Sequence, residues 1–515
     1  MKIRMVALPV LLLAASALAA CGSGSDAAGG EFATDGTFAV AVDSDPGDLN
    51  PLTTNLVNAQ IVGLYSYDTL LDVDPESGEL EPFLAESWTE SPTKVTYTLR
   101  DDITCADGTP FTAATAAANL NWIIDPKNES PRLESVVPAD ATVTAEGDLL
   151  TITTPTPRPF MLYNLGAQQM VCDAGLADPK SLSAGSNGTG LFVIEKVVAG
   201  DSITLKRREG YIWGPKDTTS ETRGVPETVT IKIVPSPSTA TNLLRSGGLN
   251  AAVVSGKDEE RLGDLKSMAS PATSGMIIYN HDAAVATADP AVRRALTQAV
   301  DLDVLTDILT DGKGKRATSL LGEDPSLCTY DTIEGHLPTY DPEAAAGAIG
   351  AAGPVDVTLV YDNATAARSA AAEYVAKQWE AAGAKVKLDG GDENYLISRS
   401  FATDDPTSWT ATLGLNLQSG TPAIFPQYLS GPPAPEGTNF ASIDNKAYRD
   451  LTASAAGQTG DEACATWGKA EAALFDAADL IPVSVTPYEM YFNGATTIVR
   501  PVGGMLPGAA IRVLS

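Results

Sequence analysis

The stretch that most constrains the fold spans residues 95–122, where a strand pattern passes through a tight turn into a helix pattern. The apolar residues Val95, Tyr97 and Leu99 alternate with polar ones, a period typical of a half-buried β-strand. An Asp-Gly-Thr-Pro segment then breaks the chain, because Gly adopts positive φ readily and Pro fixes φ. Thr112 follows as a candidate cap for an alanine-rich helix. This order of elements is typical of an α/β protein.

A second strand–helix–strand pattern lies later in the chain, over residues 355–388. Two short apolar strand patterns flank a helix pattern, and Gly383 stands just past the helix as a natural left-handed stop. A crossover of this length argues for parallel pairing of the two strands. The 515 residues are also long enough for more than one lobe.

Several short motifs share an order that resembles the signature of the family 5 extracellular solute-binding proteins. That family is the peptide and nickel group that serves ABC importers. The matching segments are residues 64–71, 84–88, 107–113, 187–192 and 293–301. The sequence departs from the family pattern at Pro92-Thr93, where Asp-Gly is usual, and at Cys105, where Trp is usual.

The resemblance implies a two-lobed α/β clamshell of the periplasmic-binding-protein type II-like class, with an extra subdomain in the first lobe. The apolar segment before Asn280 is then the crossing into the second lobe, and the segment after Ile481 is the return. The expected organisation is a signal peptide (1–20), a flexible tether (21–36), lobe I (37–276, with an inserted subdomain at about 52–186), lobe II (277–481) and a return to lobe I (482–515).

The first thirty residues have the pattern of an export signal and a tether. Lys2 and Arg4 precede an apolar core at residues 6–18, which is too short for a dedicated spanning helix. Leu-Ala-Ala-Cys at its end resembles the bacterial lipobox, which implies that Cys21 becomes the first mature residue and carries palmitate or a similar acyl chain on its sulfur. A plain cleaved signal with an incidental cysteine is the alternative. We expect a lipid-anchored protein on the extracytoplasmic face of the bacterial membrane.

Four further cysteines invite two disulfides in an exported chain. Of the three possible pairings, Cys105–Cys172 and Cys328–Cys464 are favoured, because each keeps its bridge within one half of the chain. A metal site is the competing interpretation. No CxxC motif occurs, and both histidines stand far from any cysteine in the sequence, so no metal or other cofactor is predicted.

Composition narrows the class of function. A formal net charge of −31 argues against a nucleic-acid partner, because phosphate binding needs clustered Lys and Arg. No GxSxG, HExxH or Walker A pattern is present, and two histidines leave few general bases. With 65 Asp and Glu, any chosen carboxylate pair is uninformative, so a carbohydrate-active enzyme stays as a minor alternative. A non-enzymatic binding function fits better.

A clamshell binds its ligand by closing over it, so both lobes must contact the ligand. We expect uncharged donors, acceptors and aromatic groups to line the crevice. The candidates are Thr53, Asn55, Asn280, Trp409, Gln418, Ser419, Thr421 and Tyr488. Arg293 and Arg294 are either ligand groups or part of a solvated helix face, and the solvated face is the favoured interpretation.

One departure from the peptide-binding relatives concerns residues 415–422. The resemblance places Gln418 where those relatives have an Asp that holds the α-amino group of a peptide. A neutral amide cannot pair with an ammonium group, which removes roughly 2–3 kcal/mol of charge-assisted binding. The hypothesis is that dipeptides are not bound in this way. The possible ligands are then a longer peptide held by main-chain hydrogen bonds, a neutral sugar or another solute.

The sequence therefore predicts a monomeric, lipid-anchored receptor that captures an oligopeptide or related small solute for an ABC importer and works with its permease subunits. A lipid-anchored sensor without a transporter is the alternative from another class. The two share one architecture, so the sequence does not separate them.

Overall fold

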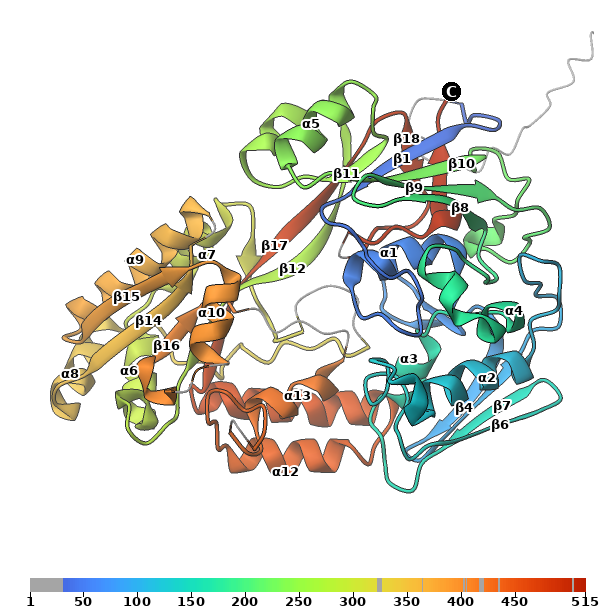
Figure 1. Ribbon diagram of the computed structural model, residues 1–515. Coiled ribbons are helices and arrows are strands. Elements are labelled where there is room, and N and C mark those ends of the chain that lie inside the picture. The colour runs from blue at the N-terminus through green and yellow to red at the C-terminus, as the bar shows by residue number, and fades with distance from the viewer. Residues whose placement is uncertain are drawn as a thin grey trace, which may run out of the picture.

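The computed structural model of the protein describes residues 31–515 without 322–326, 364, 402, 404, 416–420, 434–435 and 503. Figure 1 shows two lobes joined by a pair of long strands, β12 (Lys266–Tyr279) and β17 (Leu480–Phe492). These strands belong to a sheet with the order β15-β14-β16-β12-β17-β11-β1-β10-β9-β8, in which β13 also pairs with β17. The two-lobed α/β class that the sequence predicts is confirmed.

The first lobe is built around the half of this sheet that runs from β11 to β8. Its elements are β1 (Thr37–Val42), α1 (Val57–Ser66), β8 (Phe192–Val198), β9 (Ser202–Arg207), β10 (Thr228–Ile233), α5 (Pro237–Arg245), β11 (Ala251–Val253), and the C-terminal pair β18 (Ala495–Thr497) and β19 (Ile511–Val513). Strand β1 pairs in parallel with β10 over its whole length.

A subdomain of the first lobe carries its own four-stranded sheet, in the order β4-β5-β7-β6. Its elements are β2 (Leu71–Val73), β3 (Leu80–Pro82), β4 (Ala85–Ser91), β5 (Lys94–Leu99), α2 (Ala113–Ile124), β6 (Thr142–Glu146), β7 (Leu149–Thr153), α3 (Met161–Gly166) and α4 (Asp173–Ala177). The predicted strand is β5, and its burial alternates as a half-buried strand should. The Thr112 hydroxyl accepts a hydrogen bond from the Thr115 N–H at 3.3 Å, so the predicted helix cap is confirmed.

The second lobe covers the other half of the main sheet with helices (Figure 1). Its elements are α6 (Pro290–Gln298), α7 (Leu302–Thr310), β13 (Lys315–Arg316), α8 (Pro342–Ala352), β14 (Asp356–Asp362), α9 (Ala366–Ala381), β15 (Lys385–Gly391), α10 (Glu393–Ser400), β16 (Ala411–Leu413), α11 (Pro426–Leu429), α12 (Lys446–Ala455) and α13 (Gly460–Asp476). Strands β14 and β15 pair in parallel, as predicted. Gly383 adopts a φ of +102° just past α9, which a residue with a Cβ rarely adopts.

Two disulfides hold loops to helices, and both are the pairings that the sequence favours. Cys105–Cys172 joins the turn before α2 to the residue before α4, with Cα atoms 6.1 Å apart. Cys328–Cys464 joins a loop to the first turns of α13, with Cα atoms 5.2 Å apart. Each bridge therefore stiffens one lobe and leaves the connection between the lobes free.

A buried carboxyl group, that of Glu471, lies on α13 in the second lobe. Glu471 is 3% exposed and accepts hydrogen bonds from the Leu320 N–H at 2.7 Å and from the Thr332 hydroxyl. Burial raises the pKa of Glu471 from 4.5 to about 7. Between these values the folded state holds a proton that the unfolded chain has released, so stability falls as the pH rises through this window.

We predict that Glu471→Gln removes this loss, because an amide oxygen accepts the same two hydrogen bonds and never ionises. Relative to wild type, the free energy of unfolding of the variant should rise by up to roughly 3 kcal/mol between pH 4.5 and pH 8. Denaturant titrations across this range measure it. The exposed Glu462→Gln on the same helix is the matched control. A difference that does not change with pH would contradict the prediction.

Candidate functional site

The junction between the lobes consists of strands β12 and β17, which pair antiparallel from Lys266↔Phe492 to Ile278↔Leu480. Toward the first lobe, β17 also pairs with β11, and toward the second lobe, β12 also pairs with β16. Gly275 lies within β12 at a φ of +71°, where an added Cβ would lie 2.3 Å from Cδ1 of Leu309. This point of the ribbon therefore requires glycine, both for its backbone conformation and for the close approach of α7.

The lobes also meet on the side opposite to this ribbon, where α13 reaches the subdomain of the first lobe (Figure 1). The rings of Phe160 and Trp467 have their centroids 6.1 Å apart. A cavity of about 110 Å³ lies beside them, lined from the first lobe by Glu90, Arg158 and Phe160 among others, and from the second by Gln458, Asp461 and Cys464 among others. Among the described residues, the lobes therefore meet at the end of α13 as well as at the crossing strands.

The first turn of α1 lies at the inner edge of the first lobe, toward the two crossing strands (Figure 1). Leu56 and Val57 begin this helix without a side-chain cap, and they are 56% and 63% exposed. Single exposed apolar residues are common on protein surfaces, so this pair offers apolar surface at the inner edge of the lobe and does not by itself mark a binding site. Sequence reasoning missed this pair, although apolar residues in place of a polar cap were a readable signal.

Next to this turn, a cationic side chain is held in place by neutral partners. Arg132 donates from Nη1 to Oδ1 of Asn55 at 3.1 Å and from Nε to Oε1 of Gln168 at 3.0 Å. Burial lowers the pKa of the Arg132 guanidinium, which nevertheless stays charged. Asn55 also donates to the Pro131 carbonyl at 3.0 Å, so its amide is oriented by two contacts.

The predicted site residues that the structure describes lie on separate elements of the two lobes and the crossing strands. Asn55 is exposed, and Thr53 beside it donates its hydroxyl to Oδ2 of Asp48 at 2.6 Å. Tyr488 is 49% exposed on β17, in the crossing ribbon. Thr421 is only 5% exposed, at the start of a short helical turn in the second lobe. Gln418 and Ser419 lie outside the described residues.

Asn280 and Trp409 are interior residues of the second lobe, which corrects the expectation that they line the crevice. Asn280 is 1% exposed, and its amide donates to the carbonyls of Pro406 at 2.6 Å and Trp409 at 2.9 Å. Its Oδ1 accepts from the Asp282 N–H at 3.0 Å. The Trp409 indole is fully buried and stacks near the ring of Phe440. Both residues hold the loop after β12 in place.

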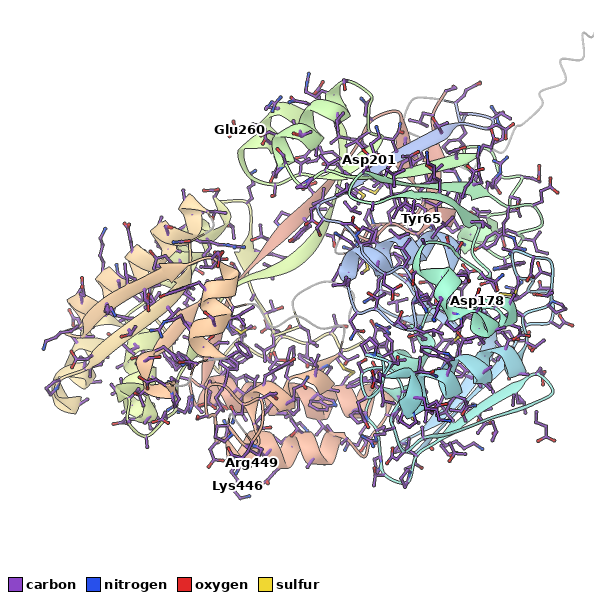
Figure 2. The ribbon with its side chains drawn as sticks, in the orientation of Figure 1. Tyr65, Asp178, Asp201, Glu260, Lys446 and Arg449 are labelled. Carbon is purple, nitrogen blue, oxygen red and sulfur yellow. A yellow bond between two sulfur atoms is a disulfide. The ribbon has the colours of Figure 1, made fainter. Side chains whose placement is uncertain are left out.

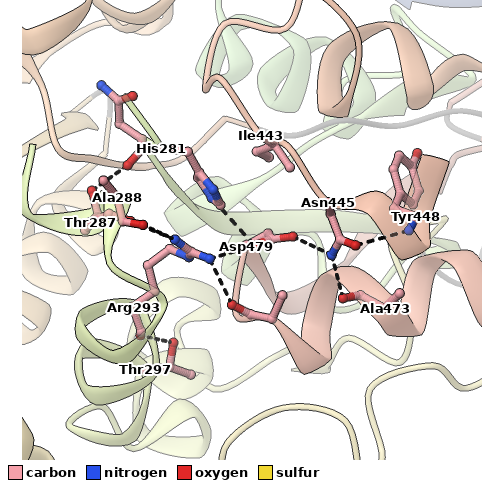
Figure 3. Close-up of polar contacts among 12 residues, drawn as sticks. His281, Thr287, Ala288, Arg293, Thr297, Ile443, Asn445, Tyr448, Ala473 and Asp479 are labelled. Carbon is pink, nitrogen blue, oxygen red and sulfur yellow. Dashed lines mark hydrogen bonds and ion pairs between the residues drawn. The ribbon is translucent and has the colours of Figure 1, made fainter. Parts of the chain in front are cut away.

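A buried ion pair stands next to this loop (Figure 3). Arg293 is 5% exposed, and its Nη2 lies 3.1 Å from Oδ1 of Asp479. Asn445 donates to the other carboxylate oxygen at 2.8 Å, and Arg293 also donates to the Thr287 carbonyl at 2.9 Å. Arg293 is therefore not on a solvated helix face, contrary to the favoured interpretation, because Asp479 supplies a counter-charge within the lobe. Its neighbour Arg294 is exposed, as expected.

His281 completes this group of polar side chains. Its Nε2 lies 3.7 Å from Oδ1 of Asp479, and the ring is mostly buried. Burial, reinforced by the Arg293 cation, lowers the pKa of His281 to about 3. The imidazole is neutral at physiological pH, so it contributes packing here and no charge.

Two further features of the described part of the chain bear on other kinds of site. Among these residues, no three or more His, Cys, Asp or Glu side chains gather in a way that would hold a metal ion. None of the helices in the described ranges combines the length and the apolar character needed to cross a membrane.

Comparison with known proteins agrees with this architecture. A sequence model described as "Bacterial extracellular solute-binding proteins, family 5 Middle" matches residues 79–453. The glutathione-binding protein GsiB of Escherichia coli K12 is 26% identical over 438 residues, which cover 81% of this chain and 82% of that protein.

Solved structures add further similarity. A substrate-binding protein of Microbacterium hydrocarbonoxydans, complexed with 4-hydroxybenzoate hydrazide, is 26% identical with a TM-score of 0.70, covering 93% of this chain and 100% of that chain. The ABC transporter substrate-binding protein CtaP of Listeria monocytogenes is 20% identical with a TM-score of 0.81, covering 94% and 100%, and shows the shared fold.

The buried ion pair yields a stability prediction with a neighbouring control. Arg293→Ala leaves Asp479 buried without its cation, which should lower the free energy of unfolding by about 3–5 kcal/mol. Arg294→Ala removes one exposed hydrogen bond to the Asp476 carbonyl and should cost less than about 1 kcal/mol. Chemical denaturation of both variants measures the difference. Equal losses would show that Asp479 does not depend on Arg293.

Proposed function

The chain belongs to the bacterial extracellular solute-binding proteins of family 5, and on that premise we propose that it captures a peptide or a related small solute outside the cell and presents it to the permease of an ABC importer. Members of this family are solute-binding proteins and not enzymes. The single observation that carries the proposal is the pair of long antiparallel strands that links two lobes with separate cores.

This arrangement suits binding by closure. A two-stranded ribbon bends and twists at lower cost than a packed core, because few buried side chains change their neighbours. A solute between the lobes favours the closed state only by the contacts that it makes with both lobes. The two disulfides and the buried ion pair each lie within one lobe, so closure leaves them intact.

The chemistry near the junction favours a solute with neutral polar groups and an apolar part. Asn55 offers an oriented amide, Leu56 and Val57 offer exposed apolar surface, and Tyr488 offers an aromatic ring on the crossing ribbon. Main-chain amides and apolar side chains of an oligopeptide match these groups. Two relatives bind solutes of this range, since GsiB is named for glutathione and DppA of Helicobacter pylori was solved with the peptide STSA.

We further propose that the receptor is a monomer tethered by acylated Cys21, which lies outside the described residues. The lobe boundaries that accompany this proposal are 37–276 and 482–515 for lobe I and 277–481 for lobe II, since β12 and β17 carry the chain across. Cys21→Ser should release the protein from the membrane fraction into the medium or periplasm of expressing cells. Retention of the variant in the membrane would argue for another anchor.

The solute class is tested by a thermal-shift screen with glutathione, tripeptides, tetrapeptides, dipeptides, neutral sugars and nickel complexes. A solute at a free concentration 100-fold above its Kd stabilises the folded state by about 2.7 kcal/mol. We expect dose-dependent increases in melting temperature with one or more tripeptides or tetrapeptides, and none with dipeptides. Stabilisation by sugars or nickel complexes alone would contradict the peptide proposal.

A pair of tyrosine variants tests where the solute binds. Tyr488→Ala removes the ring on the crossing ribbon and should raise the Kd of the solute found by the screen by about tenfold, equivalent to roughly 1.4 kcal/mol. Tyr340, also 49% exposed, lies two residues before α8, a helix that lies away from the crossing strands (Figure 1). Tyr340→Ala is the matched control. Isothermal titration calorimetry measures both. Equal Kd values for the two variants would place the site elsewhere.

A further inference from the structure

The rings of Phe160 and Trp467 make a contact between the lobes. It joins the subdomain of the first lobe to α13, which lies away from the crossing strands (Figure 1). Phe160 is partly buried and packs against a small apolar cluster of the second lobe that includes Ala455, Ala463 and Trp467. We infer that this contact is a closing latch: it forms when the lobes shut, and it sets solute affinity without touching the solute. The inference rests on the proposed function of binding by closure.

On the first lobe, the backbone around Phe160 is held in one conformation. Its φ of +55° is left-handed, a conformation that a bulky side chain adopts only when its surroundings enforce it. The Arg158 N–H donates to the Pro92 carbonyl at 2.9 Å, and Arg158 Nη2 lies 2.8 Å from Oδ1 of Asp140. On the other side, the Tyr97 hydroxyl donates to the Leu162 carbonyl at 2.6 Å. The segment therefore keeps its shape whether or not the second lobe is in contact.

On the second lobe, the receiving surface is equally rigid. Trp467 is 3% exposed on α13, and Tyr330 packs closely on the same helix, since a Cβ at Gly468 would lie 3.3 Å from its ring. The disulfide Cys328–Cys464 ties the first turns of α13 to the loop beside them. Two surfaces that are each held within their own lobe meet as rigid bodies, so they separate without unfolding either lobe.

The packing at this contact is that of a separable interface. The cavity of about 110 Å³ beside the rings is lined by residues of both lobes. An unfilled cavity of this size is unusual inside a close-packed core. Contacts between lobes resemble transient interfaces, and relative motion is expected unless they are large and apolar. Phe160 also keeps part of its surface exposed, unlike the fully buried Phe38 and Phe192 of its own lobe.

The test measures the distance between the lobes in solute-free protein by double electron–electron resonance. Spin labels are placed at Asp178→Cys on the first lobe and Lys446→Cys on α12 of the second lobe, two exposed and well-separated positions (Figure 2). In the labelled wild-type background without solute we expect two populations, a short-distance one in which the latch is formed and a longer-distance one in which the lobes are apart. Phe160→Ala should make the longer-distance population several-fold larger than it is without the substitution. Phe83→Ala, which removes a partly buried ring of the same lobe that packs on its own core, is the matched control.

Phe160→Gly distinguishes loss of the latch from a folding defect. It removes the ring, and glycine adopts the left-handed φ without strain. It should open the lobes as Phe160→Ala does while melting at a higher temperature than the alanine variant. For the solute found by the screen, both variants should show a dissociation rate raised by severalfold. Distance distributions of Phe160→Ala and Phe160→Gly that match the wild type would overturn the latch. Because the distances are measured without solute, that result would not contradict the proposed function. In the same way, the distance measurement tests the latch even if the screen finds no solute.

Discussion

The backbone pairing of β12 with β17 is the constraint on which the rest of the structure depends. The two strands carry the chain from one lobe to the other and back, and each lobe adds its own strand to one of them. Because hydrogen bonds hold the strands in register, the lobes cannot slide along each other. Rotation about the ribbon is the motion that remains, and Gly275 marks where its backbone departs most from a regular strand.

Such a motion requires rigid lobes, and the buried side chains supply that rigidity. In the first lobe, Asp68 accepts from the Trp213 indole at 2.9 Å and from the Thr189 hydroxyl at 3.0 Å. Burial raises the pKa of Asp68 to about 6, a cost that these two hydrogen bonds partly offset. In the second lobe, Arg293 and Asp479 play the corresponding part. Buried polar groups of this kind tolerate little rearrangement, because a broken contact leaves an unpaired group in the interior.

The sequence predicts those features that short-range physics determines. Alternation of apolar residues located β5, a hydroxyl before an alanine-rich run identified the cap at Thr112, and Gly383 marked the end of α9. The disulfide pairs followed from keeping each bridge within one half of the chain. The motifs of a known family then identified the architecture.

Features that depend on contacts between distant segments were not predictable in this way. Asp479 lies 186 residues from Arg293, so nothing near Arg293 shows that its charge is neutralised in the interior. In the sequence, nothing near Asn280 shows that its amide is buried. Its partners, the carbonyls of Pro406 and Trp409, belong to a loop more than a hundred residues away. The approach of Phe160 to Trp467 depends on how the lobes meet, which no local pattern encodes.

The central claim is that the two lobes move as rigid bodies about β12 and β17 and close over a solute. Small-angle X-ray scattering tests it directly, on the wild-type protein with and without the solute that raises its melting temperature most. The account predicts a smaller radius of gyration and a shorter maximum dimension at saturation, with an unchanged circular dichroism spectrum. Scattering curves that coincide while calorimetry shows full binding would contradict it.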